Sequence, residues 1–491
     1  MNFYKILGVL ILLLITSVQA EKPNIIFIMA DDQGYGDASC YNPESKFKTP
    51  GIDRIAKEGI RFTDAHSASA VCTPTRYGLL TGRYPWRSRL QKGVMVTGQG
   101  NLITRELTIA QFLKNNGYKT AIIGKWHLGF NYEMPEGQKM SSTKTVYEWD
   151  SYNIQKAPIG SKVVEGPITK GFDYYRGFHH AREMHSWIVQ DEVVKHIELT
   201  EVLPQLTSES VTYIKERAEK KDGPFFLYVP LGSPHTPIAP SKGWLGKSGV
   251  SPYADFVMES DNSVVEILKA LDDTGMAENT IVFFTTDNGC SPKANFKQLL
   301  AKGHDPSYSL RGHKADAWDG GHRVPYVVRW PKQIPAGQVS DELICHNNLF
   351  ATCAEILGQN IPSEAAPDSF SILPVLKGSK SDKPTHPVVI HHSYSGLFAI
   401  RQGSWKYLAC TGSGGWSKGG DGKPSQLYDL SKDRKESNNL IESNPEKAKY
   451  MLKLLEDSIA KGRTTPGPDL KNDTEVVIWK KSSPKKKKKK K

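Results

Sequence analysis

Residues 24–32 read N-I-I-F-I-M-A-D-D, a short apolar run that ends in two aspartates. Three later stretches have the same form. Continuous apolar runs of this length are typical of strands that are buried on both faces of a parallel sheet. The three further runs are T-A-I-I-G before Lys125-Trp126-His127, P-F-F-L-Y-V-P-L before Ser233-Pro234-His235, and T-I-V-F-F-T-T before Asp287-Asn288-Gly289.

Helical patterns lie between these runs, at residues 107–117 and 256–275. The second pattern stops at Gly275, as helix C-termini often do. Alternation of strands and helices predicts an open α/β sheet. In such sheets ligands bind beyond the carboxyl ends of the strands. We therefore expect the polar residues that follow the four runs to converge on one site.

Oxygen ligands dominate two of the four strand ends. Asp31 and Asp32 follow the first run, and Asp287 and Asn288 follow the last. Hard oxygen donors suit Ca²⁺ or Mg²⁺ better than zinc. Adjacent carboxylates repel each other unless a cation lies between them. These four residues are candidate metal ligands.

A single cysteine stands in the stretch S-A-S-A-V-C-T-P-T-R-Y-G-L-L-T-G, residues 67–82. The pattern predicts a short helix that is capped by Thr73 and ended by Gly82. Cys72 and Arg76 would share one face of it. Cys72 would also lie at the positive end of the helix, where anions bind and thiols ionise easily.

Basic side chains complete the candidate site. Lys125 and His127 are two residues apart, so on extended backbone they point to the same side. His235 follows another of the four strands. A divalent cation, an arginine, lysines and histidines around one nucleophile indicate a site for transfer of an anionic group.

These motifs together resemble those of the type I sulfatases, the formylglycine-dependent sulfate ester hydrolases of the alkaline phosphatase superfamily, and among them the arylsulfatase A-like group. The resemblance extends from residue 24 to about residue 460. Besides the Asp31-Asp32 and D-N-G motifs, it rests on C-T-P-T-R with L-L-T-G-R, on G-K-W-H-L-G at 124–129, on P-H-T-P at 234–237, and on R-G-H-K at 311–314 ahead of W-D-G-G-H-R-V-P.

The resemblance implies a role for each matched residue. Cys72 would be oxidised by a separate maturing enzyme to Cα-formylglycine, whose hydrated aldehyde is the nucleophile. Arg76 and Lys125 would hold this hydrate, and His127 would take a proton from its second hydroxyl. His235 and Lys314 would contact the sulfate, with His235 helping to protonate the leaving oxygen. Ca²⁺ would be bound by Asp31, Asp32, Asp287, Asn288 and the modified Cys72.

The substrate is expected to be a sulfated carbohydrate or an aryl sulfate. The segment G-F-H-H-A-R-E-M-H-S-W, residues 177–187, is dense in groups that bind anionic sugars. We hypothesise that His180 and Arg182 line the substrate pocket, although a solvent-exposed loop explains the composition equally well. Trp416 could stack on a sugar or pack on a sheet edge, and packing is favoured slightly.

Two other functions stay open. A phosphonate or phosphate ester hydrolase of the same superfamily would use a similar site, although the pair Lys125 and Lys314 favours sulfate. A non-catalytic protein that binds sulfated glycans would be expected to have lost site residues, yet every matched position is filled. Thr75 replaces the commoner serine of the signature. Because a hydroxyl is retained, we expect maturation to survive.

The predicted organisation has four parts. Residues 1–20 read as a secretory signal peptide, with a lysine, an apolar run and small residues before the cleavage point. A sulfatase catalytic domain at 21–375 would have the alkaline-phosphatase-like α/β fold, a central, mostly parallel sheet flanked by helices. A smaller C-terminal α+β subdomain at 376–463 would hold an antiparallel sheet and a helix. Residues 464–491 would form a flexible, Lys-rich tail.

The charge distribution and the cysteine content limit the kinds of partner that the protein can be expected to bind. The net charge is +12, but nine lysines lie in the last twelve residues, so the basic character belongs to the tail. We therefore expect no nucleic-acid partner. No later stretch is apolar enough to span a membrane, and the exported protein would be periplasmic or extracellular. Six cysteines without a C-x-x-C motif argue against a zinc knuckle, and the sequence does not assign disulfides.

Overall fold

The structure is a computed structural model that describes residues 21–146, 151–379 and 383–480. The predicted signal peptide, residues 1–20, lies outside the described residues, as do the last eight lysines. Within the described ranges, no helix combines the length and the apolar character needed to cross a bilayer. All six cysteines are present as free thiols.

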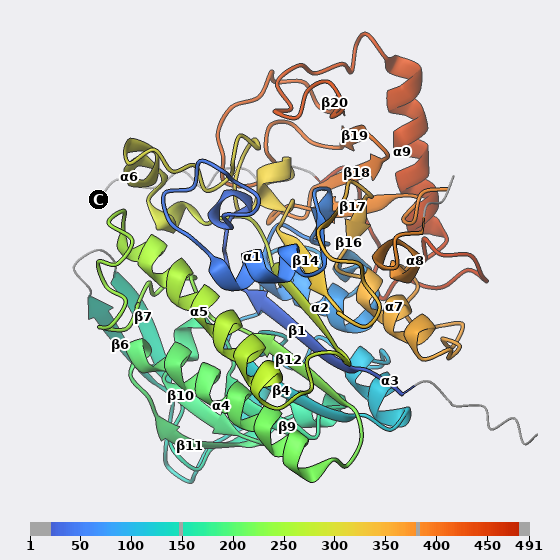
Figure 1. Cartoon of the computed structure of the whole chain (residues 1–491). Helices are drawn as coiled ribbons and strands as arrows, with labels where there is room; N and C mark the ends of the chain where they lie inside the picture. The colour runs from blue at the N-terminus through green and yellow to red at the C-terminus, as the bar shows by residue number, and fades with distance from the viewer. Residues whose placement is uncertain (1–20, 147–150, 380–382, 481–491) are drawn as a thin grey trace, which may run out of the picture.

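A twelve-stranded sheet forms the centre of the molecule (Figure 1). Its five middle strands, β13, β1, β12, β4 and β9, pair in parallel, and antiparallel pairs flank them on both sides. The four strands predicted from the sequence are the adjacent strands β13, β1, β12 and β4, which confirms the α/β fold. The full order is β15 (Gln338–Ser340), β2 (Ile60–Phe62), β14 (Tyr326–Arg329), β13 (Thr280–Thr286), β1 (Asn24–Ala30), β12 (Phe225–Pro230), β4 (Lys119–Lys125), β9 (Tyr174–Phe178), β10 (Ser186–Val189), β11 (Glu192–His196), β8 (Lys162–Val164) and β5 (Asn131–Glu133).

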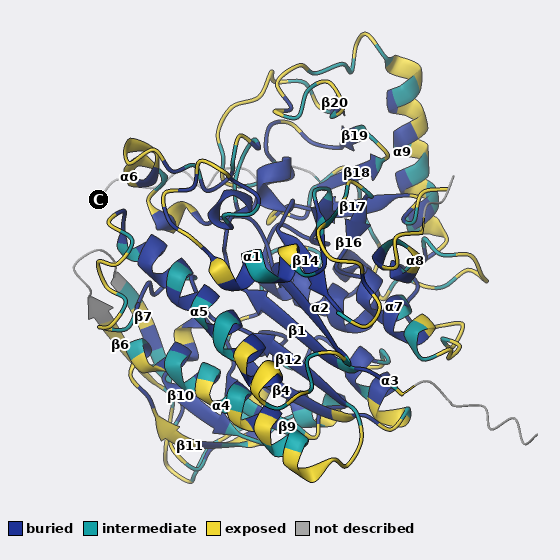
Figure 2. Cartoon of the chain, viewed as in Figure 1, coloured by how far each residue is buried: buried dark blue, intermediate teal, exposed yellow. Residues whose placement is uncertain are grey.

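Strand β1 shows why the central runs are apolar throughout. Alternate side chains of a strand face opposite sides of the sheet, and both sides are covered here. Ile26 and Ile28 pack into the core beneath α1 (Pro50–Lys57), α4 (Leu199–Lys220) and α5 (Pro252–Asp273). Ile25 and Phe27 pack into a second core with α2 (Cys72–Thr81), α3 (Ile109–Asn115), α7 (Asn348–Ile356) and α8 (Leu373–Leu376). In Figure 2 the central strands are mostly dark blue, the colour of buried residues.

Smaller elements surround this sheet. The antiparallel strands β6 (Ser141–Val146) and β7 (Ser151–Lys156) form a separate pair, and β3 (Ala65–His66) pairs with β16 (Ile344–Cys345). A short helix α6 covers Phe296–Ala301. The C-terminal part holds a four-stranded antiparallel sheet and the helix α9 (Pro445–Ala460), as predicted (Figure 1). The strands of that sheet are β17 (Val389–His392), β18 (Phe398–Gln402), β19 (Trp405–Leu408) and β20 (Gln426–Asp429).

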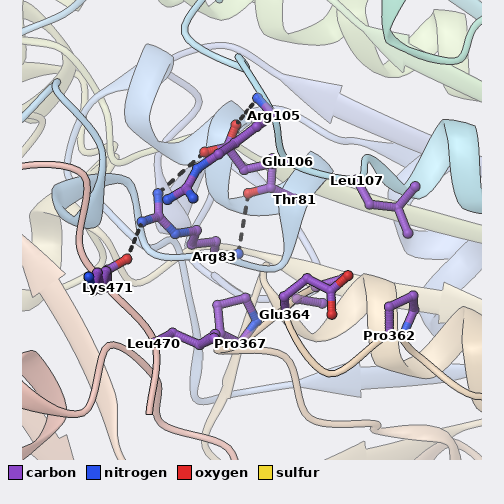
Figure 3. Close-up of a pocket in the computed structure, with 12 residues that line it drawn as sticks. Thr81, Arg83, Arg105, Glu106, Leu107, Pro362, Glu364, Pro367, Leu470 and Lys471 are labelled. Carbon is purple, nitrogen blue, oxygen red and sulfur yellow. Dashed lines mark hydrogen bonds and ion pairs between the residues drawn. The ribbon is translucent and has the colours of Figure 1, made fainter. Parts of the chain in front are cut away.

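Residues 464–480 contact the part of the molecule that holds the twelve-stranded sheet. The sequence instead predicts a flexible tail for this segment. Asp473 accepts hydrogen bonds from Arg83 at 3.0 Å and from Arg105 at 2.7 Å. Both arginines line a crevice of about 330 Å³, and Figure 3 shows how their side chains lie there. These ion pairs join residues far apart in the chain, so local composition gave no sign of them. The domain boundaries given above stay predictions.

Buried histidines make a pH dependence of stability expected. Burial lowers the pKa of His386 and of His392 to about 3, against about 6.5 in an unfolded chain. The unfolded state therefore binds more protons below pH 6.5, and stability falls as the pH drops from 6.5 towards 3, by about 1.4 kcal/mol per pH unit for each group. In thermal unfolding, the stability of His392→Gln should decrease less steeply between pH 7 and pH 5 than that of the wild type. The exposed His196, changed to Gln as a control, should leave the slope unaltered; equal slopes in all three proteins would contradict the prediction.

Candidate active site

The candidate site lies at the carboxyl ends of four neighbouring strands. Asp31 and Asp32 follow β1, Asp287 and Asn288 follow β13, and Lys125 is the last residue of β4. The register aligns Ala30 of β1 with Thr286 of β13, which brings the two acidic pairs together. His235 comes from the loop after β12. The four predicted carboxylate and amide ligands, with Lys125 and His235, therefore lie at one edge of the sheet.

Two cations neutralise the first pair of carboxylates. The Arg76 guanidinium donates to Asp287 Oδ2 at 2.8 Å and lies 3.5 Å from Asp31 Oδ2. The Lys125 ammonium group donates to Asp31. Burial raises the pKa of Asp31, but Lys125, His235 and Arg76 outweigh it and hold that pKa well below its usual range. Burial and the Asp31 charge raise the pKa of Asp287 to about 7.

The second group surrounds Asp32. Lys314 Nζ donates to both oxygens of Asp32, at 2.5 and 2.7 Å. Asn288 Nδ2 donates to Asp32 Oδ1 at 2.8 Å, and His235 Nε2 lies 3.5 Å from Asp32 Oδ2. The loop that carries Lys314 approaches closely, because a Cβ at Gly289 would meet the carbonyl oxygen of Gly320 at 1.8 Å. The glycine of the D-N-G motif thus permits this packing.

The donor set fits a hard cation. Asp31 Oδ1 and Asn288 Oδ1 are buried and have no hydrogen-bond partner among the described residues. Such orphaned oxygens are rare, since buried polar atoms are normally satisfied. Ligand atoms of Asp31, Cys72 and Asp287 lie within 4.8 Å of one another, as do those of Asp31, Asp32 and His235. Oxygen donors in this number suit Ca²⁺.

Cys72 lies at the N-terminal end of α2, as expected, but the helix begins at Cys72 itself and not after a cap at Thr73. The preceding Val71 occupies the N-cap position, and Thr73 instead accepts a hydrogen bond from the backbone N–H of Met95 at 3.1 Å. Burial raises the pKa of the Cys72 thiol, and the nearby charges of Lys125 and Lys314 do not reverse this. The expected easy ionisation is therefore wrong for the unmodified thiol. Gly82 ends the helix with φ 62°, as predicted.

Two residues of the site have a strained backbone. Asp32 and His127 have φ of 65° and 56°, a region that residues other than glycine rarely adopt. Such residues cluster at functional sites, where the surrounding fold imposes the conformation. His127 donates from its backbone to His179 O at 2.7 Å, and its Nε2 lies 3.1 Å from Met95 O. Its Nδ1 is buried with no partner among the described residues.

The two predicted substrate residues have different surroundings. His180 is buried, and its Nε2 lies 3.1 Å from both Thr97 Oγ1 and Glu183 Oε1. Its Nδ1 accepts from the backbone N–H of Arg182 at 3.2 Å, so both ring nitrogens are engaged within the protein. The Arg182 side chain is exposed and hydrogen-bonds Tyr152 of β7, which interacts electrostatically with Lys314 and Cys72. Tyr152 had no sequence signal, because it stands outside every motif.

These surroundings predict separate effects for the two residues. Arg182→Ala should raise KM for a sulfated sugar on the order of ten-fold, since hydrogen bonds to charged groups contribute roughly 1.5–3 kcal/mol. His180→Ala should lower the free energy of unfolding by about 1–3 kcal/mol, because it strips a partner from the buried Glu183. Steady-state kinetics and chemical denaturation separate the two effects. Unchanged KM in Arg182→Ala would remove this residue from the substrate site.

A second buried cluster, His66, His322 and His391, does not have metal-site geometry. The rings of His322 and His391 stack with centroids 3.8 Å apart and planes only 14° from parallel. A metal ion lies near the plane of each imidazole that ligates it, and two stacked planes do not share such a point. His66 Nδ1 instead lies 3.0 Å from His322 Nδ1, within a hydrogen-bonded core.

The fold and the site together define a hydrolase of the alkaline-phosphatase-like class, and comparison with known proteins gives its family. The family model described as Sulfatase matches residues 23–359, so the chain belongs to the sulfatase family and is a sulfuric ester hydrolase. An N-acetylgalactosamine-6-O-sulfatase from Bacteroides thetaiotaomicron is 31% identical over 491 aligned residues, covering 89% of this chain and 93% of that protein. Human arylsulfatase A is 32% identical over 450 residues, covering 86% and 84%.

A solved structure gives the same result. It is named for the metabolism of multiple glycosaminoglycans by Bacteroides thetaiotaomicron, and it superposes with a TM-score of 0.75 at 29% identity. The superposition covers 89% of this chain and 99% of that one. The arylsulfatase-like resemblance drawn from the sequence is thereby confirmed.

Proposed function

We propose that this sulfatase removes sulfate from carbohydrate, with formylglycine derived from Cys72 and a Ca²⁺ ion in the site. One observation carries the proposal. Cys72 stands at the N-terminus of α2 with its Sγ beside the oxygens of Asp31 and Asp287, while a carboxylate oxygen of Asp31 and the amide oxygen of Asn288 have no partner among the described residues. Nucleophile and cation ligands are thus adjacent in one buried place.

The modified residue, when present, supplies a hydrated aldehyde as nucleophile, and Ca²⁺ supplies positive charge beside the sulfate. Asp31, Asp32, Asp287 and Asn288 would hold the ion. Arg76 and Lys125 offset the buried negative charge and orient the side chain at position 72.

The remaining groups act on the ester. Lys314, held on Asp32, adds a positive charge where the anionic ester would bind. His235 would protonate the leaving oxygen, and its small exposed fraction supports this role. His127 would accept a proton at Nδ1, which has no partner among the described residues.

The names of the relatives support a sulfated carbohydrate as the substrate. The bacterial relative's name makes a 6-O-sulfated N-acetylgalactosamine residue the first substrate to test. The exposed guanidinium of Arg182 is suited to an anionic sugar. Export to the periplasm or the medium, predicted from residues 1–20, would place the enzyme where such polysaccharides occur.

The mass of the tryptic peptide 62–76 tests the mechanism. The protein should be produced together with a formylglycine-generating enzyme that modifies a control sulfatase. An aldehyde at position 72 that reacts with a hydrazide is the expected result, with sulfate release from N-acetylgalactosamine 6-sulfate exceeding hydrolysis of a matched phosphonate ester. An unmodified thiol in an active protein would contradict the proposed nucleophile.

A further inference from the structure

A groove of about 930 Å³ lies between the C-terminal subdomain and the loop at residues 92–93. Its walls include Lys92, Tyr394, Leu397, Thr411, Trp479 and Lys480. Tyr394 and Trp479 are 38% and 48% exposed, a high fraction for aromatic side chains. No acidic residue lines it among the described residues. The groove is therefore basic and aromatic.

The groove is tied to the catalytic loops by backbone hydrogen bonds. Tyr394 N–H donates to Ala315 O at 2.9 Å, and Ala315 follows Lys314 directly in the chain. On the other side, Gly93 N–H donates to Tyr394 O at 2.8 Å. Two residues beyond Gly93, Met95 bonds both Thr73 and His127. The aromatic wall thus lies next to the loops that hold the nucleophile and the sulfate.

A third aromatic ring, that of Trp416, extends this wall beside Tyr394. The Trp416 ring, 46% exposed, lies 5.5 Å from the Tyr394 ring. Its backbone N–H donates to Asp316 Oδ1 at 2.8 Å, and Asp316 is two residues from Lys314. Asp316 also accepts from His313, so one carboxylate joins the Trp416 loop to the catalytic loop. Trp416 lies against the ring of Tyr394, which belongs to no strand, and not on a sheet edge as the sequence favoured, and nearly half of it faces solvent.

The chemistry of these walls selects an anionic sugar chain. Exposed aromatic rings offer flat apolar faces to the C–H faces of pyranose rings. Lys92 is exposed and has no ion-pair partner in the part of the chain that the structure describes. Lys480 is partly buried, with its Nζ donating to Gln91 O at 3.0 Å. Two cations without a lining carboxylate favour a sulfated or carboxylated ligand.

We propose that this groove binds the anionic sugar units adjoining the one whose sulfate ester is cleaved, so that the enzyme prefers oligosaccharides to monosaccharides. The inference rests on the proposed carbohydrate sulfatase function. It assigns binding of the chain to Lys92 and Tyr394, separately from the chemistry at Cys72.

The test compares substrate lengths in the full-length, matured enzyme. The double variant Lys92→Ala/Tyr394→Ala should lose at least ten-fold more kcat/KM on a chondroitin 6-sulfate hexasaccharide than on N-acetylgalactosamine 6-sulfate, with the loss in KM. Lys449→Ala/Tyr450→Ala on α9 is the matched control, because both residues are exposed there and Tyr450 is 47% exposed. Both variants keep the lysine tail, so its attraction for polyanions cancels. Equal losses on both substrates would overturn the proposal.

Binding distinguishes failure of the groove from failure of the proposed function. Calorimetric titration of the same hexasaccharide into Cys72→Ala protein should give at least ten-fold weaker affinity when Lys92 and Tyr394 are also replaced, and no change with the control pair. If the enzyme hydrolyses no sulfated sugar but this difference in affinity is observed, the proposal for the groove is supported and the proposed function is rejected. Turnover of sulfated sugars without any groove effect on binding would reject the groove alone.

Discussion

Cys72→Ala should abolish sulfate ester hydrolysis, with kcat falling on the order of 10³-fold or more. The residue would carry the nucleophile, and no neighbour replaces it. Arg76, Lys125 and Lys314 bear fixed positive charges that bind an anion but form no bond to sulfur. Sulfate release from an aryl sulfate and from N-acetylgalactosamine 6-sulfate measures the loss.

Cys353→Ala provides the matched control for this variant. Cys353 is also a fully buried thiol, and it lies on α7 away from the carboxylates. Its replacement should reduce stability by about 1 kcal/mol and leave kcat close to that of the wild type. A thermal melt confirms that both variants are folded. Activity of Cys72→Ala above one hundredth of the wild-type rate, from protein whose parent carries the aldehyde, would refute the assignment.

Asp31→Asn should eliminate high-affinity Ca²⁺ binding and lower kcat/KM by about 10²-fold or more. The change keeps the shape of the side chain but removes its negative charge. The positive charges of Arg76 and Lys125 are then less fully neutralised. The cation would then meet excess positive charge from these side chains. Calorimetric Ca²⁺ titration measures the affinity directly.

Stability gives an independent measure of the same site. A ligand at 100 times its Kd stabilises the folded state by about 2.7 kcal/mol, so chelation with EGTA should lower the Tm of the wild type and leave that of Asp31→Asn unaffected. Asp261→Asn is the control, because Asp261 is buried away from the candidate metal ligands and accepts from the backbone N–H groups of Gly51 and Ile52 at the start of α1. That variant should keep the full response to Ca²⁺. A normal response in Asp31→Asn would exclude the assigned ligand.

Some contacts of the site were beyond sequence reasoning. The motifs predicted which residues come together in the site. They did not predict which lysine pairs with which aspartate, because each pair joins side chains that are far apart in the sequence. Lys125 bonds Asp31 and Lys314 bonds Asp32 across intervals of 94 and 282 residues. The engagement of His180 by Glu183 likewise depends on packing, because the same residue types in an exposed loop would have met solvent.

The sequence by itself determined the four central strands, the short helix that ends at Gly82 and has Cys72 at its N-terminal end, and the family. These features are local: an apolar run long enough to be buried on both faces forms a strand wherever it falls, and a signature motif is contiguous. Only the tertiary structure decided the contacts of residues 464–480 with Arg83 and Arg105, and the alignment of Tyr394 and Trp416 beside the Lys314 loop. Those contacts join segments that are distant in the chain, and their free energy comes from packing and ion pairing that exist only once the sheet and both cores have formed.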